Sequence, residues 1–102
     1  MYETFIEAIN QRLIIQLTFI SKSKGTITRT CIPFDFGPGN VAKDGLDRYH
    51  FYDLNSPEGR HTLSILPDQV IDISLTTQNF EPGNYITWTP KWVVPRDWGI
   101  YS

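Results

Sequence analysis

Hydrophobic side chains in residues 2–11 recur at spacings of three and four, and polar side chains fill the positions between them. The apolar members of this pattern are Tyr2, Phe5, Ile6 and Ile9. Such spacing places them along one side of an α-helix. Because a helix this short is only marginally stable alone in water, we expect it to pack against the rest of the fold.

From residue 13 onward apolar and polar residues alternate, which is typical of β-strands. Five segments rich in β-branched and aromatic residues are predicted to be strands: 13–20, 26–32, 48–54, 60–66 and 70–75. We expect Pro33 to end the second strand, because proline cannot donate a hydrogen bond to a sheet. Residues 34–45, with three glycines and a proline, are predicted to form a long irregular loop. Residues 67–69 leave room only for a tight corner or one turn of 3₁₀ helix.

One helix and five short strands predict a mainly β (α+β) fold over residues 1–80. Closing the strands into a small SH3-like or Sm-like barrel would remove the open edges of a five-stranded sheet. The helix would then cover one end of the barrel. An open antiparallel sheet with a packed helix is the alternative.

The third predicted strand is unusually aromatic. Alternation places Tyr49, Phe51 and Asp53 on one face, and His50 and Tyr52 on the other. We interpret the first face as core. Because an aspartate within a core face would be costly, Asp53 is expected where the strand ends. His50 and Tyr52 are expected to be partly exposed.

The composition changes in residues 81–102, which contain three prolines and all three tryptophans of the chain. This tail is too aromatic for a solvated linker. Its rings are expected to pack either on the protein's own barrel or on a partner, which would be a second copy or another protein. Since tryptophan is enriched among residues that dominate protein interfaces, the candidate partner-binding residues are Trp88, Trp92 and Trp98.

Charge and cysteine content narrow the class of protein. The 102 residues carry a formal net charge of −2. This charge gives no support for broad electrostatic binding of nucleic acid. Cys31 is the only cysteine, so there is no internal disulfide, and a reducing compartment is expected. The first ten residues lack the basic region of a secretion signal, and the apolar runs are too short to span a membrane. We therefore predict a cytoplasmic protein that does not contact a membrane.

The predicted helix is followed by the segments "RTCIPF", "RYHFYDL" and "RHTLSILPDQVIDISLTTQNFEP". This order resembles the WYL domain of bacterial transcriptional regulators, over roughly residues 3–82. Tyr49, His50 and Phe51 stand where that family has Trp, Tyr and Leu. Other positions that fit the family pattern are Arg29, Pro33, Leu63, Asp68, Val70 and Phe80.

The resemblance implies an Sm-like barrel that binds nucleic acid or a nucleotide-like ligand in a basic, aromatic groove. It also implies a role in transcriptional regulation, with the signal passed to a DNA-binding domain. A partner protein would have to supply that domain here. Ser64 and Gln69 replace two basic residues of the family, which argues against a strongly anionic ligand.

Strand pairing could gather several basic and aromatic side chains into such a groove. The candidate ligand-binding residues are Arg29, Arg48, His50, Tyr52, Arg60 and His61. Arginine suits phosphate or carboxylate because its fork donates two parallel hydrogen bonds. A flat ring stacked on Tyr52 or His50 would contribute ~1–3 kcal/mol. The alternative is that the arginines are solvated strand and turn residues and that the rings belong to the core.

No spacing in the chain matches a nucleophile elbow, a phosphate loop or a zinc site. The sequence therefore predicts no catalytic residues, no metal and no cofactor, and Cys31 is interpreted as a small buried hydrophobe. The predicted function is that of a non-enzymatic, regulatory ligand-binding domain. The alternative is a protein-interaction module that acts through the tryptophan-rich tail.

Overall fold

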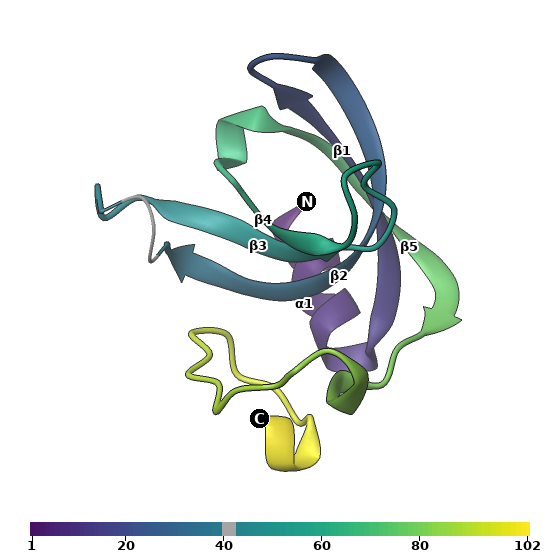
Figure 1. Ribbon diagram of the computed structural model, residues 1–102. Coiled ribbons are helices and arrows are strands. Elements are labelled where there is room, and N and C mark those ends of the chain that lie inside the picture. The colour runs from purple at the N-terminus through teal and green to yellow at the C-terminus, as the bar shows by residue number, and fades with distance from the viewer. Residues whose placement is uncertain (40–42) are drawn as a thin grey trace.

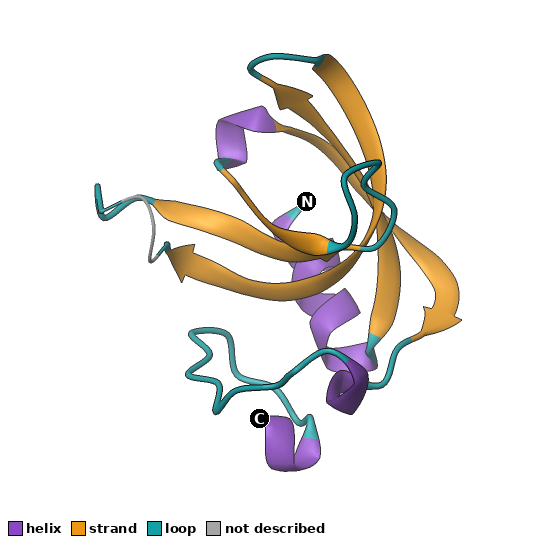
Figure 2. Cartoon of the chain, viewed as in Figure 1, coloured by secondary structure: helices purple, strands orange, loops and turns teal. Residues whose placement is uncertain are grey.

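The computed structural model describes residues 1–39 and 43–102 (Figure 1). Helix α1 spans Tyr2–Gln11, as predicted, and is followed by the strands β1 (Leu13–Ser21), β2 (Gly25–Pro38), β3 (Asp47–Asp53), β4 (His61–Ile65) and β5 (Val70–Asn79). Three short 3₁₀ turns complete the described elements: η1 (Pro67–Gln69), η2 (Pro82–Asn84) and η3 (Gly99–Tyr101) (Figure 2). The predicted α+β class and the one-turn corner before the last strand are confirmed.

The strands form a five-stranded antiparallel sheet in the order β4-β3-β2-β1-β5. The sheet is strongly bent, and β5 passes behind β1 and β2 in the view of Figure 1. Within the described residues no ladder joins β4 to β5, and the sheet is therefore open. The closed barrel expected from the sequence is not confirmed.

Strand β2 is longer than the sequence predicted. It continues through Pro33 to Pro38, so the expected end at Pro33 is wrong, as is the expected loop for residues 34–38. Pro33 is tolerated because the ladder with β3 shifts register between Pro33 and Asp35. Proline fits such a bulge, where one ladder position is left unpaired. Residues 40–42 of the expected loop lie outside the described residues.

The core lies between α1 and one face of the sheet. The ring of Phe5 on α1 packs edge-on against Tyr49 and Phe51, with centroid distances of 4.9 and 5.4 Å. The predicted alternation along β3 is confirmed, because Tyr49, Phe51 and Asp53 are buried whereas the residues between them are partly exposed.

Asp53 is the last residue of β3, as predicted, but it remains on the core face and is buried. Its carboxylate accepts a hydrogen bond from the backbone N–H of Asn55 at 3.0 Å and forms an ion pair with Arg29 Nε at 3.3 Å. These partners offset the cost of burying the charge. Cys31 pairs with Asp53 across the ladder and is fully buried. Burial, and secondarily the Asp53 charge, raises the pKa of the Cys31 thiol.

Residues 81–102 pack on the protein's own helix and sheet (Figure 1). The Trp98 side chain is 2% exposed, and its Nε1 donates to the carbonyl of Ile9 at 2.8 Å. This bond gives the Ile9 carbonyl, in the last turn of α1, a second donor beside the backbone N–H of Arg12 at 3.3 Å. The Trp98 ring also packs edge-on against Phe80 at 5.4 Å. In the described part of the chain, no helix has the length and apolarity needed to cross a membrane.

Candidate ligand-binding groove

The sheet face opposite α1 carries a row of polar side chains across β2, β3 and β4. His50 on β3 pairs with Asp35 on one side and with Ser64 on the other, and Gly37 pairs with Arg48. The register shift after Pro33 puts Asp35 on this face. The three strands together form a polar floor.

The tail forms an aromatic wall beside this floor. Phe34 of β2 packs against Trp88 at 5.9 Å and against Trp92 at 5.8 Å between ring centroids. The two indoles pack edge-on against each other at 6.3 Å. Trp88 is 47% exposed, so much of its ring remains available to a ligand.

A groove of about 680 Å³ lies between the floor and the wall. This volume falls within the range of small-molecule sites, roughly 300–1,000 Å³. Its polar lining residues are Asp35, Arg48, His50, Thr62, Ser64, Thr89 and Lys91; its apolar ones are Phe34, Pro38, Gly39, Phe51, Trp88, Trp92 and Val93.

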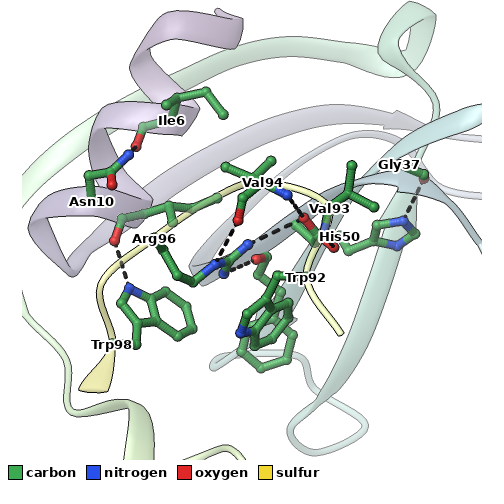
Figure 3. A network of polar contacts seen from close by, with 12 residues as sticks. Ile6, Asn10, Gly37, His50, Trp92, Val93, Val94, Arg96 and Trp98 are labelled. Carbon is green, nitrogen blue, oxygen red and sulfur yellow. Dashed lines mark hydrogen bonds and ion pairs between the residues drawn. The ribbon is translucent and has the colours of Figure 1, made fainter. Parts of the chain in front are cut away.

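Both ring nitrogens of His50 are engaged within the protein. Nε2 lies 2.8 Å from the carbonyl oxygen of Gly37 (Figure 3), and Nδ1 lies 2.8 Å from Ser64 Oγ. Because a carbonyl only accepts, Nε2 must carry a proton. In the neutral ring Nδ1 then accepts from the Ser64 hydroxyl. The Ser64 oxygen therefore keeps lone pairs that can accept a hydrogen bond from a ligand.

Asp35 and Arg96 hold the wall in place, and Figure 3 shows Arg96 with its tail neighbours Trp92, Val94 and Trp98. The Asp35 carboxylate accepts from the backbone N–H groups of Val93 and Val94, each at 2.9 Å. Arg96 Nη2 forms an ion pair with the same carboxylate at 3.2 Å, and the Arg96 side chain is 1% exposed.

The rest of the Arg96 guanidinium is equally enclosed. It donates to the carbonyls of Phe34 and Val94, and it lies 4.0 and 4.5 Å from the ring centroids of Trp92 and Trp98. Burial lowers the pKa of Arg96 to about 10, and Asp35 opposes this shift. Arg96 is thus still charged at neutral pH.

Arg48 brings positive charge to the groove. Its Nη1 and Nη2 donate to the two carboxylate oxygens of Asp44 at 2.9 and 3.0 Å. Hydrogen bonding by Arg48 is the main cause that lowers the pKa of Asp44 to about 2. Lys91 adds a second, exposed cation from the tail. Since Arg96 pairs with Asp35 and Asp44 pairs with Arg48, Lys91 is the cation of the groove lining that forms no ion pair among the described residues.

Two of the six residues predicted to bind a ligand, Arg48 and His50, line this groove. Tyr52 lies on the same face but is half-buried between Phe34 and Tyr85, with ring centroids at 5.8 and 5.5 Å.

Three predicted residues lie elsewhere. Arg29 pairs with Leu17 on the core face and is bound to Asp53. His61 is opposite Asp53 on that same face, and Arg60 is exposed just before β4. The structure therefore does not bring Arg29, Arg60 and His61 to the groove.

The three tail tryptophans differ in their surroundings. Trp98 is buried and Trp92 is half-buried, with its Nε1 donating to the Tyr101 carbonyl at 2.8 Å. Trp88 is the most exposed of the three.

Sequence reasoning did not identify Asp35, Arg96, Lys91 and Thr62 as site residues. A signal for the first two was present in "FDF" and "WVVPRDW", where a charged residue stands among large apolar ones. Such placement indicates a charge that needs a buried partner.

The described residues contain no group of three or more His, Cys, Asp or Glu side chains that could hold a metal ion. Comparison of the chain with protein-family models, curated proteins and solved structures gave no match. The WYL resemblance stays a prediction.

Proposed function

We propose that this protein is a non-enzymatic domain that binds a small nucleotide-like ligand, a flat ring that carries one anionic group. The proposal rests on one observation, which is that a single groove combines an exposed aromatic ring with basic side chains. The exposed ring of Trp88 offers a stacking surface, while Arg48 and Lys91 offer positive charge. Stacking on such a ring contributes ~1–3 kcal/mol, and arginine binds phosphate or carboxylate in a bidentate manner.

The hydroxyls of Thr62 and Ser64 would complete recognition by binding polar groups between the ring and the anion. Each is exposed, on alternate positions of β4, and therefore on the same side of the strand.

The size and charge of the groove favour a mononucleotide over a nucleic acid. Its volume of about 680 Å³ suits one drug-sized molecule. A polymer would need a basic track along its backbone, whereas the chain carries a net charge of −2. Binding rather than catalysis is proposed because His50 has both nitrogens engaged within the protein, which leaves it no free base.

We further propose that ligand binding is regulatory, because one wall of the groove belongs to the tail. A ligand held between wall and floor would cover the exposed ring of Trp88 and so change the surface shown to a partner. Following the WYL resemblance, that partner would be a DNA-binding protein in the cytoplasm, and the bent sheet would be an open relative of an Sm-like barrel. The buried Cys31 thiol suits a reducing compartment.

A second candidate function is a protein-interaction module. Apolar side chains of the tail are exposed at Trp88, Val93 (61%) and Ile100 (88%). In this function the tail would bind a second copy or another protein through these exposed side chains rather than through the buried Trp98.

The test is a titration with adenosine 5′-monophosphate, adenosine and a short single-stranded RNA, followed by tryptophan fluorescence at low and moderate salt. We expect saturable binding of the monophosphate that is lost in Trp88→Ala and weakened in Arg48→Gln. Arg60→Gln removes an exposed arginine outside the groove and should bind as the native chain does.

Three outcomes would contradict the proposal. RNA binding without mononucleotide binding would favour a nucleic-acid interface. No binding of any probe, together with concentration-dependent association lost in Ile100→Ser, would favour the interaction module. Equal effects of Arg48→Gln and Arg60→Gln would show that binding depends on overall charge rather than on the groove.

A further inference from the structure

We propose that Asp44 acts as an internal competitor for the anionic site of the groove, occupying the guanidinium of Arg48 until an anionic ligand displaces it. This inference rests on the proposed function.

The geometry of the pair is that of arginine bound to an anionic ligand. Nη1 and Nη2 of Arg48 each donate to a different oxygen of Asp44, at 2.9 and 3.0 Å. This two-pronged arrangement is the one that arginine uses for carboxylate and phosphate groups. The Asp44 carboxylate, which is not itself part of the groove lining, therefore occupies the two Arg48 donors that a ligand anion would use.

The two partners differ in their contact with water. The Arg48 side chain is 14% exposed, whereas the Asp44 side chain is 42% exposed. The carboxylate can move into solvent at little cost, because exposed ion pairs are weak, while the guanidinium stays at the groove. Asp44 Oδ1 also accepts from the Leu46 N–H at 3.0 Å, which keeps the carboxylate near Arg48.

The other arginine–carboxylate pairs among residues 1–39 and 43–102 are built differently. In the pairs Arg29–Asp53 and Arg96–Asp35 the carboxylate is 2% and 13% exposed. A ligand anion cannot displace those carboxylates, because the protein encloses them. Exchange is thus a property of the Arg48 pair, in which the arginine lines the groove, whereas the Arg96 pair contributes only the enclosed carboxylate of Asp35 to the groove lining.

If Asp44 competes with a ligand anion for Arg48, removing the Asp44 charge should strengthen the binding of anionic ligands and leave the binding of neutral ligands unchanged. The experiment measures the affinity of adenosine 5′-monophosphate and of adenosine for the native chain, Asp44→Asn, Arg48→Gln and the double variant. Asp44→Asn is expected to bind the monophosphate about two- to fivefold more tightly, the scale of an exposed ion pair. The affinity for adenosine should not change.

Two controls separate competition from general electrostatics. Asp47→Asn removes an equal charge from an exposed aspartate nearby, and should leave the monophosphate affinity unchanged. Asp44→Asn should add nothing in the Arg48→Gln background, because Asp44 acts through Arg48.

The outcomes distinguish this inference from the proposed function. If the native chain binds the monophosphate and Asp44→Asn gives no gain, the competitor role is overturned and the proposed function stands. The same holds if Asp47→Asn gives an equal gain, or if the gain persists without Arg48. If neither the native chain nor Asp44→Asn binds the monophosphate, the proposed function fails and this inference fails with it.

Discussion

Asp35 and Arg96, 61 positions apart in the chain, form an ion pair of 3.2 Å in which both side chains are largely withdrawn from water. The pair joins β2 to the tail beneath the wall of the groove. Removing one partner of a buried ion pair is strongly destabilising, because the other charge is left buried and unmatched. An exposed pair does not have this effect.

Arg96→Met is therefore expected to lower the free energy of unfolding by about 3–5 kcal/mol. The variant also loses hydrogen bonds to two backbone carbonyls and the contacts with two indole rings. Urea unfolding followed by circular dichroism measures the loss. Arg60→Met, at an exposed position, is the matched control and should change stability little. A loss in Arg96→Met no larger than in the control would show that the pair does not hold the tail.

The tail tryptophans should separate into structural and ligand-facing residues. Trp98→Ala removes a buried ring and its bond to Ile9, and is expected to cost about 3–5 kcal/mol of stability. Trp88→Ala removes a half-exposed ring and should cost much less, while abolishing nucleotide binding. Thermal and urea unfolding of the two variants provide the comparison. Equal losses would contradict the different roles assigned to the two rings.

Gly37 lets the tail approach the sheet closely. A Cβ at this position would lie 2.8 Å from Val93 Cγ2, closer than carbon atoms can approach. We expect Gly37→Ala to destabilise the fold by roughly 1–3 kcal/mol through overpacking and to weaken nucleotide binding. Gly39→Ala is the control for stability, since within residues 1–39 and 43–102 its Cβ would meet no atom nearer than 3.7 Å.

Rescue provides a further check on this close approach. The double variant Gly37→Ala/Val93→Ala should regain most of the lost stability in urea unfolding, because the clashing methyl groups are gone. If the second substitution worsens the loss, the cause is not the contact between these two residues.

The Asp44 carboxylate should titrate well below its ordinary range. Its pKa is lowered from 3.8 to about 2, mainly by hydrogen bonds from Arg48. Because the folded chain favours the ionised form, the pair stabilises the fold above pH 3.8, and this contribution disappears as the pH falls through about 2. Carbon-13 NMR of the carboxyl group reports the midpoint directly. In Arg48→Gln the midpoint should rise towards 3.8, and an unchanged midpoint would show that Arg48 is not its cause.

Local patterns predicted the helix, the corner at residues 67–69 and the alternation along β3, because these depend on spacing within one segment. The length of β2 could not be predicted in the same way. Whether Pro33 ends a strand depends on a register shift against β3, and that shift is set by the partner strand.

Only some of the groove residues could be predicted, because the others depend on contacts between segments far apart in the sequence. Arg48 and His50 share a face because they are two residues apart on one strand. The placement of Arg29 requires the register between β1 and β2, where it stands opposite Leu17 on the core face. The wall depends on Asp35 and Arg96, whose contact across 61 positions leaves no local pattern.

The bond from Trp98 to the Ile9 carbonyl also bears on the order of folding during synthesis. It spans 89 positions, and contacts of such separation form late because a long loop must close first. A ribosome that has released residues 1–80 has delivered the helix and every strand, but neither Trp88 nor Arg96. The nascent chain therefore has every strand of the sheet before its tail can form the wall of the groove, and during that interval the Ile9 carbonyl lacks the hydrogen bond from Trp98.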